Sequence, residues 1–290
     1  MQGNAPLVPW RRLYSAQPRR TNMSADAPEP PMTLPSHSPH RPAVEILNES
    51  GSSPVVLLCE HASNFIPPEY AGLGVSSADL ERHIAWDIGA AGVTRRLSQL
   101  IAAPAFLGQY SRLLIDLNRP LTSPASIVTR SEATGIPGNE SLDPAERARR
   151  AALYFEPFHH AVERLLEERR RAGRPTLIVA VHSFTPTFHG EERPWEAGII
   201  YDKGMAFAEA TLGRLRLHDA TLDAGANVPY SVMPDEYYGL LEYGDCAGNP
   251  ALLVEIRQDL LLRPEQQDDW AHRLAAALAI DTGLEMLKQD

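Results

Sequence analysis

The sequence predicts a layered α/β fold, in which strands alternate with long helices. Two observations support this prediction. Short apolar runs recur from Pro54 onward, and stretches with helical periodicity lie between them. The length of 290 residues corresponds to one large domain or two modest ones, at roughly 100–200 residues per domain.

The first 45 residues differ in composition from the rest of the chain. They contain nine of the 25 prolines and five arginines, with almost no apolar periodicity. Such a segment buries too little apolar surface to offset its ordering entropy. We therefore expect residues 1–45 to form a disordered tail and residues 46–290 a single domain. Two alternatives stay open for the tail, an arginine-rich targeting segment over Met1–Met23 and a mis-assigned start ahead of Met23 or Met32.

Five apolar runs predict the strands. They are Pro54–Cys59, Ser111–Leu117, Thr176–Val181, Ala197–Tyr201 and Ala251–Ile256. The first is typical of a strand that is buried on both faces. Residues 120–140 are expected to form a long loop, and such loops in compact domains often carry function.

Three helices are expected between these strands. The first covers Ser76–Ile101 and begins at a serine N-cap. The second begins at Asp143-Pro144, an acidic cap before a proline at the first helical position, and stops at Gly173, with Pro157 as a site for a kink. The third is an amphipathic helix over residues 264–287.

Composition excludes several classes of partner. The formal charge of -10 argues against nucleic acid or an anionic membrane as the main partner. No apolar run approaches the ~20 residues of a membrane-spanning helix. The two cysteines, Cys59 and Cys246, are too few for a disulfide scaffold or a thiolate zinc cluster. We expect a cytoplasmic protein that binds a small molecule, as a monomer or a small homo-oligomer.

Polar residues stand at the carboxyl ends of the predicted strands, where ligand sites of open α/β sheets lie. In chain order they are Glu60, His61, Arg112, Asp116, Asn118, Arg119, His182, Glu255 and Arg257. Imidazoles, carboxylates and guanidinium groups together are typical of a hydrolytic metal site that takes an acidic substrate. One histidine at a strand end is more often structural than a ligand, whereas two bring the alternatives close to balance.

The motifs around these residues resemble those of the N-formylglutamate amidohydrolase family. The motifs are Cys59-Glu60-His61-Ala62-Ser63-Asn64, Trp86-Asp87-Ile88-Gly89, Tyr110-Ser111-Arg112, Asp116-Leu117-Asn118-Arg119, Val181-His182-Ser183-Phe184, Asn227-Val228-Pro229-Tyr230-Ser231 and Glu255-Ile256-Arg257-Gln258-Asp259-Leu260. Their order and spacing match from about residue 54 to residue 285. The resemblance implies a three-layer α/β/α domain around a central mixed, mostly parallel sheet, similar to zinc carboxypeptidases and aminoacylase-like hydrolases.

The resemblance also implies an activity and a cofactor. The expected enzyme is a metal-dependent amidohydrolase, with one divalent ion such as Zn²⁺, that removes the N-formyl or N-acyl group from an acidic amino acid. N-formyl-L-glutamate, an intermediate in histidine degradation, is the implied substrate. Two alternatives stay open. One is a deacylase or carboxypeptidase-like peptidase for another N-acyl amino acid or small peptide, and the other is a non-catalytic binder of an acidic small molecule.

Roles for single residues follow from the same resemblance. His61 and His182 match the metal histidines, and Glu255 matches the general-base glutamate. Asn118 and Arg119 match a pair that holds the substrate carboxylate. Arg112 is expected to share that role or to polarise the carbonyl, and Arg257 is expected to contact the substrate.

The third metal ligand is less clear than the two histidines. Zinc carboxypeptidases place a glutamate ligand three residues after the first histidine, where this sequence has Asn64. The ligand must then come from elsewhere, and Asp87 is the first choice because it lies in a matching motif. Glu60 is the second choice, although neighbours on an extended chain point to opposite faces, and Asp116 is the third.

Overall fold

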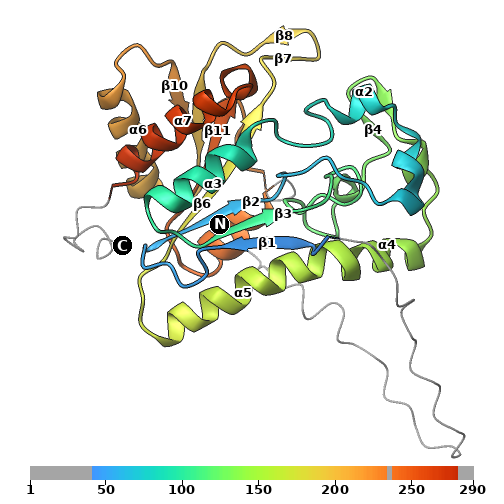
Figure 1. Ribbon diagram of the computed structural model, residues 1–290, viewed down its shortest axis with the longest axis horizontal. Coiled ribbons are helices and arrows are strands. Elements are labelled where there is room, and N and C mark those ends of the chain that lie inside the picture. Colours follow the sequence, from blue (N-terminus) through green and yellow to red (C-terminus); the bar gives the residue numbers. More distant parts are fainter. Residues whose placement is uncertain (1–40, 234–236, 280–290) are drawn as a thin grey trace, which may run out of the picture. The chain divides into compact units, whose positions relative to one another are not determined.

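The computed structural model describes residues 41–233 and 237–279, and these belong to one compact unit, His40–Asp290. A seven-stranded sheet forms the centre of this unit, in the order β1-β3-β2-β6-β11-β9-β10 (Figure 1). The strands are β1 (Val44–Leu47), β3 (Ala105–Gly108), β2 (Val55–Cys59), β6 (Leu177–Phe184), β11 (Ala251–Arg257), β9 (Ala197–Ile200) and β10 (Ala224–Ala226).

The sheet is mixed and mostly parallel, as predicted. The pairs β3–β2, β2–β6, β6–β11 and β9–β10 are parallel. The pairs β1–β3 and β11–β9 are antiparallel. Two small hairpins lie outside the sheet, β4 (Arg130–Ser131) with β5 (Thr134–Gly135), and β7 (Thr187–Phe188) with β8 (Glu191–Glu192).

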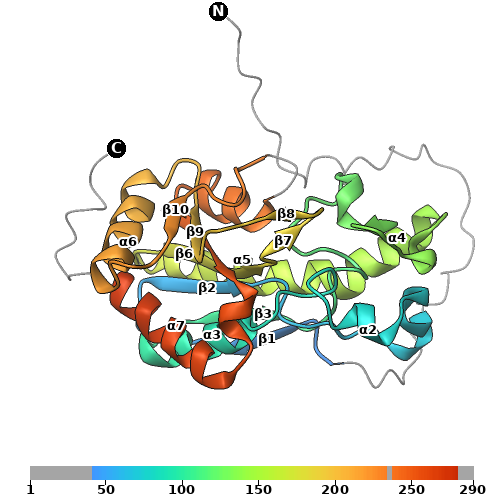
Figure 2. The ribbon, with the colours of Figure 1, turned by 90° about the horizontal axis from the view of Figure 1, so that it is seen from above.

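Helices cover both faces of the sheet, which confirms the three-layer α/β/α architecture (Figures 1 and 2). One face packs against α3 (Ala90–Leu100), α6 (Met205–His218) and α7 (Pro264–Ala277). The other face packs against α5 (Glu156–Arg171) and the π-helical turn η4 (Ala151–Phe155) before it. Side chains of β2 alternate between these two cores, since Leu57 belongs to the first and Leu58 to the second.

The remaining elements are short. They are α2 (Ser77–Leu80), α4 (Pro144–Arg150), the second π-helical turn η5 (Leu240–Asp245), and the 3-10 helices η1 (Pro68–Gly74), η2 (Pro124–Ser126), η3 (Pro137–Asn139) and η6 (Gln258–Leu261). Residues 120–140 hold only such short pieces, so the predicted loop is confirmed. Among the described residues, no helix combines the length and the apolar character that crossing a membrane would need.

The predicted helix Ser76–Ile101 is wrong, because the chain forms two helices separated by turns. Ser76 caps α2 as expected, and its hydroxyl accepts a hydrogen bond from the Asp79 amide. Helix α3 begins only after Gly89, whose φ is 82°. A residue in the left-handed conformation cannot continue a right-handed helix. The apolar periodicity continues through Gly89, so it could not predict that the helix is interrupted there.

The predicted strand Ser111–Leu117 is also wrong, since these residues form turns. The Ser111 hydroxyl and the Arg112 amide both donate to the carbonyl of Ala85, and the Asp116 amide donates to the carbonyl of Ser126. The apolar side chains of Leu113 and Leu114 are buried in the core on the α5 face. The backbone N–H groups thus find their hydrogen-bond acceptors in neighbouring loops instead of in an adjacent strand.

The other predicted elements are confirmed within a few residues, and several were missed. The side chain of Asp143 caps α4 with Pro144 at its start, and α4, η4 and α5 run on to Gly173, which has a φ of 63°. Strands β1, β3 and β10 and helix α6 were not predicted. The boundary expected at residue 45 falls inside β1, and the rest of the expected tail, residues 1–40, lies outside the described residues, as does the predicted helix beyond residue 279.

Candidate metal-binding active site

Three parallel strands bring the predicted site residues to one edge of the sheet. Strand β2 ends at Cys59, two residues before His61, while His182 lies in β6 and Glu255 in β11. Glu255 and His182 are direct partners in the register of β11 and β6. Partners in a ladder place their side chains on the same face, so these two side chains share one face at the carboxyl ends of the strands.

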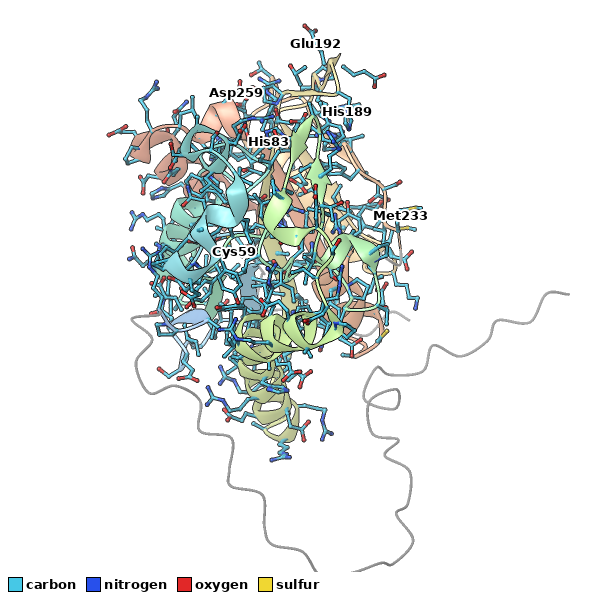
Figure 3. All side chains as sticks on the ribbon, turned by 90° about the vertical axis from the view of Figure 1, so that its right-hand side faces the viewer. Cys59, His83, His189, Glu192, Met233 and Asp259 are labelled. Carbon is cyan, nitrogen blue, oxygen red and sulfur yellow. The ribbon has the colours of Figure 1, made fainter. Side chains whose placement is uncertain are left out.

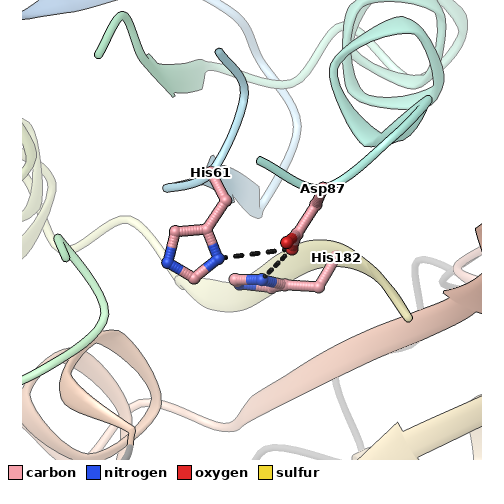
Figure 4. A group of neighbouring side chains, drawn as sticks. All are labelled: His61, Asp87 and His182. Atoms are coloured by element: carbon pink, nitrogen blue, oxygen red, sulfur yellow. Dashed lines mark hydrogen bonds and ion pairs between the residues drawn. The ribbon is translucent and has the colours of Figure 1, made fainter. Parts of the chain in front are cut away.

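His61, Asp87 and His182 form a buried cluster that could hold a metal ion (Figure 4). The Oδ2 atom of Asp87 lies 2.7 Å from Nδ1 of His182 and 3.3 Å from Nδ1 of His61. Each of the three residues is only 3% exposed. The structure therefore brings together the three residues expected as metal ligands, two nitrogen donors and one carboxylate oxygen, a donor set that suits zinc.

The break before α3 positions Asp87 in this cluster. The Asp87 amide donates to the carbonyl of His61, and the Asp87 carbonyl accepts from the Ala90 amide. A Cβ atom at Gly89 would lie 2.4 Å from Cβ of Leu261, so only glycine fits at this turn. The turn at Gly89 therefore belongs to the framework that holds Asp87 beside His61.

Two further carboxylates bind the outer nitrogens of the histidines, that is, the Nε2 atoms, which point away from Asp87. Nε2 of His61 lies 2.7 Å from Oδ1 of Asp116, and Nε2 of His182 lies 3.1 Å from Oε2 of Glu60. A carboxylate on the second nitrogen of a metal-binding imidazole fixes the ring orientation and increases its basicity. Glu60 and Asp116, the alternatives for the third ligand, thus stand behind the histidines.

The electrostatics of the cluster fit a divalent cation. Its four carboxylates are all less than 10% exposed, namely Glu60, Asp87, Asp116 and Glu255. Burial lowers the pKa of His182, but hydrogen bonds and charges of Asp87 and Glu60 outweigh it and raise this pKa to about 10. These surroundings favour positive charge at the imidazole, which a bound cation can supply. Buried oxygen atoms of Glu60 and Glu255 also lack a hydrogen-bond partner among the described residues, as expected beside an ion or a substrate.

Glu255 has the properties of a proton carrier. Burial raises its pKa to about 7, helped by the charge of Asp87 and opposed by His182, Arg112 and His61. A carboxylate with a pKa near neutrality can both take and release a proton at physiological pH. Glu255 is 6% exposed, and its Oε2 atom is one of the unpartnered oxygens.

Arg112 lies against the metal-binding cluster. Its Nη2 atom donates to Oδ2 of Asp116 at 2.8 Å, and its Nη1 atom approaches Oδ1 of Asp87 at 3.4 Å. Burial raises the pKa of Asp116, but the charges of Arg112 and His61 outweigh it and hold this pKa well below its usual range. Asp116 therefore stays ionised and links the guanidinium of Arg112 to the outer nitrogen of His61.

The predicted substrate-binding residues lie around the same edge with different partners. Asn118 accepts from the amides of Gly239 and Tyr238 through its side-chain and backbone oxygens, respectively. The guanidinium of Arg119 lies 5.9 Å from the ring centre of Tyr237. Arg257 donates to the carboxylate of Asp259 at 2.8 Å and to the carbonyl of Pro194 at 2.7 Å. Their roles toward a substrate stay predictions.

Sequence reasoning passed over Tyr230, which lies within electrostatic reach of Glu255 and Arg112, and Arg193, which donates a hydrogen bond to its hydroxyl. Tyr230 belongs to a motif that resembles the family, although no role was assigned to it. Arg193 follows the short strand β8 and has no signal in the sequence, because its position depends on contacts with distant residues. His159 also has a defined place, a fully structural one, between the Tyr243 hydroxyl and the Leu117 carbonyl.

Comparisons with known proteins identify the family of this chain. The family model of N-formylglutamate amidohydrolases matches residues 53–262. A gene product of Agrobacterium tumefaciens is 37% identical, with 82% of this chain and 94% of that chain covered and a TM-score of 0.77. The N-formylglutamate amidohydrolase of Ralstonia eutropha JMP134 has the same fold, at 18% identity, 81% and 96% coverage and a TM-score of 0.56. No curated protein sequence matches this chain. The chain belongs to the N-formylglutamate amidohydrolase family, and it is an amidohydrolase.

Proposed function

We propose that this amidohydrolase is metal-dependent and removes the N-formyl group from an acidic amino acid, with N-formyl-L-glutamate as its substrate and Zn²⁺ as its ion. The observation that supports the proposal most is the position of Glu255. Its carboxylate, with a pKa near 7, shares one face of the sheet with His182 and the rest of the His61–Asp87–His182 cluster. A proton carrier beside a metal-binding cluster is the minimal equipment for hydrolysis of an amide by water.

The metal ion would be held by Nδ1 of His61, Nδ1 of His182 and a carboxylate oxygen of Asp87. When bound, a divalent ion at such a site polarises a carbonyl group and lowers the pKa of a water molecule. Glu60 and Asp116 keep the two imidazole rings in the orientation in which Nδ1 faces Asp87. The Nδ1 atoms and the Asp87 carboxylate then stay available to the ion.

Glu255 moves the proton in this mechanism. As a carboxylate, it takes a proton from the water that attacks the formyl carbonyl. It then gives that proton to the nitrogen of the amino acid, which leaves as an amine. The burial that raises the pKa of Glu255 also suits it to donate in the second step.

Positive side chains complete the mechanism. Arg112, held in place by Asp116 and Asp87, stabilises the negative charge that develops on the carbonyl oxygen. Asn118, Arg119 and Arg257 contact the amino-acid part of the substrate. The protein as a whole is acidic, so an acidic substrate depends on such local positive charge.

Metal content and formate release test the proposal together. The protein, purified without chelator, should contain about one zinc ion per chain and should release formate from N-formyl-L-glutamate. Glu255→Gln should keep the metal and lose activity, while the matched change Glu265→Gln, at an exposed position of α7, should leave activity unchanged. Full activity of metal-loaded Glu255→Gln would overturn the role of Glu255.

A substrate panel separates the alternatives. N-formyl, N-acetyl and N-succinyl amino acids distinguish a deformylase from a deacylase for other acyl groups. Small peptides test the carboxypeptidase-like alternative. Tight binding of glutamate without turnover of any of these compounds would favour a non-catalytic binder and contradict the proposed activity. The cytoplasmic location and the place in histidine degradation stay predictions.

A further inference from the structure

The guanidinium group of Arg193 lies over two aromatic rings. Its Cζ atom lies 4.4 Å from the ring centre of Phe188 and 4.7 Å from that of Tyr230. Its Nη1 atom donates to the hydroxyl of Tyr230 at 2.9 Å. Contacts with two rings and a hydroxyl limit the rotamers that such a long side chain can adopt, so the guanidinium group is pre-positioned.

This guanidinium group has no carboxylate partner within the described part of the chain. Arg112 and Arg257, by contrast, each bind an aspartate. Arg193 is half-buried and uses a single side-chain hydrogen bond, although a guanidinium carries five N–H donors. An arginine that is stacked, partly desolvated and without a counter-ion is suited to bind an anion from outside the protein.

The chain around Tyr230 lies directly beside Glu255. Gly198 in β9 is the register partner of Glu255 in β11. The carbonyl oxygen of Val228 lies 1.6 Å from the point where a Cβ atom of Gly198 would be. The segment that leads to Tyr230 therefore packs on the same face of the sheet as the Glu255 side chain.

The charges around the Tyr230 hydroxyl agree with this position. Burial raises the pKa of Tyr230 to about 12, and the negative charge of Glu255 adds to the rise, while Arg193 and Arg112 oppose it. The phenol thus lies within electrostatic reach of the catalytic candidates on one side and of Arg193 on the other.

The backbone of Arg193 is anchored to the end of β11. Its amide donates to the carbonyl of Pro186 at 2.8 Å, and the next carbonyl, that of Pro194, accepts from Nη1 of Arg257 at 2.7 Å. Figure 3 shows His189 and Glu192 of the β7–β8 hairpin on the same side as Asp259, the partner of Arg257. Arg257 therefore supports the segment that presents Arg193.

We propose that Arg193 recognises a carboxylate of the substrate, and that Tyr230 is the residue that positions it. This inference rests on the proposed function, because it assigns substrate selectivity to the same site. The two parallel N–H donors of a guanidinium fork match the two oxygens of a carboxylate. Phe188 and Tyr230 then make the enzyme selective for acidic over neutral amino acids by holding this fork beside Glu255.

Three substrates test which carboxylate is recognised. N-formylglutamate carries both carboxylates, N-formylglutamine only the α-carboxylate, and N-formylisoglutamine only the side-chain carboxylate. Arg193→Gln should raise KM roughly 10–100-fold for substrates that carry the recognised carboxylate, with little change in kcat, and should hardly affect the substrate that lacks it. An equal loss on all three substrates, or no loss on any, would overturn the proposal.

Additional variants separate recognition from a loss of structure. Arg193→Lys keeps the charge without the planar fork and should rescue part of the selectivity. Tyr230→Phe keeps the ring but removes the acceptor, so it should reduce the preference for the recognised carboxylate by a smaller factor. Arg273, which stacks on Trp270 far from the cluster in sequence and binds Asp219, provides the control, and Arg273→Gln should keep wild-type selectivity.

A binding measurement keeps this inference independent of turnover. Glutarate carries two carboxylates and no amide bond, so calorimetry can measure its affinity even if no N-acyl substrate is cleaved. We expect Kd for glutarate to rise about tenfold or more in Arg193→Gln. Affinity for glutarate that is the same in wild type and Arg193→Gln, including undetectable binding to both, would contradict carboxylate recognition by Arg193. Absence of turnover with a clear difference in binding would contradict only the proposed activity.

Discussion

Glu255 and His182 lie side by side on the neighbouring parallel strands β11 and β6, as direct partners in their register. This pairing places the candidate general base beside a candidate metal ligand without any help from a loop. Because both residues stand in the sheet, their separation depends on the strand ladder, which is among the most rigid parts of a domain.

The first prediction concerns the pH dependence of activity. Glu255 can accept a proton only when it is ionised, and burial raises its pKa to about 7. The rate should therefore fall as pH drops below an apparent pKa of about 7 or somewhat lower, since a nearby cation favours the carboxylate. Profiles of kcat/KM for wild type and Glu255→Gln test this, because the variant should lose roughly 10²–10⁴-fold in rate and also the acidic limb. An unchanged limb in the variant would assign it to another group.

The second prediction separates metal ligands from the carboxylates behind them. Glu60→Gln and Asp116→Asn should each weaken metal binding about 10–100-fold, because they remove the negative charge that increases the basicity of the imidazole ligand. Asp87→Asn should weaken it further, since it removes a ligand charge. Competition with a chelator of known affinity measures all three. If Glu60→Gln loses the metal as completely as Asp87→Asn, Glu60 is itself a ligand.

The third prediction concerns Gly89, the residue that breaks the helix before α3. Gly89→Ala forces a Cβ atom to within 2.4 Å of Leu261 at a φ of 82°, so it should destabilise the protein by about 2–4 kcal/mol and displace Asp87. Gly173→Ala is the matched control, because Gly173 has a φ of 63° and no atom near its absent side chain. It should cost only about 1 kcal/mol and leave metal affinity intact. Chemical denaturation and metal titration of both variants provide the comparison, and equal metal affinity in the two would argue against a role for the break.

The fourth prediction is a loss of stability in acid that traces to His159. Burial lowers its pKa to about 3 from an ordinary value of 6.5, although the hydrogen bond from Nε2 to the Leu117 carbonyl opposes this shift. In the unfolded chain, His159 is protonated below about pH 6.5. In the folded protein it stays neutral down to about pH 3. The free energy of unfolding should therefore fall with decreasing pH in this interval, by up to about 1.4 kcal/mol per pH unit.

Variants isolate the contribution of His159 from that of other groups. His159→Gln removes the titration, so its stability should depend less on pH between 6.5 and 3 than that of wild type. At pH 7 it should be less stable by about 1–3 kcal/mol, because partners of the imidazole are left unpaired. His160→Gln changes the exposed neighbour and should follow the wild-type curve. Parallel curves for wild type and His159→Gln would exclude this contribution.

Sequence reasoning succeeded where function coincided with a regular strand. His61, His182 and Glu255 could be placed at one edge because parallel strands end together. The assignment of Asp87 needed the resemblance to a family, since the periodicity around it predicted a continuous helix. Sequence reasoning also predicted a strand over Ser111–Leu117, where the structure has turns. An apolar run has the same composition in a buried turn and in a sheet.

The sequence by itself determined the layered α/β class, the residue types that gather at the candidate site, and the resemblance to the family. Only the tertiary structure decided which partners these groups have: which imidazole nitrogen lies against Asp87, which carboxylates bind the other imidazole nitrogens, and that Arg193 stacks on Phe188 and Tyr230. The physical reason is distance along the chain. His182 lies 95 residues from Asp87 and 122 from Glu60, and such contacts depend on strand order and on turns such as the one at Gly89. Local periodicity reports only neighbours within a few residues.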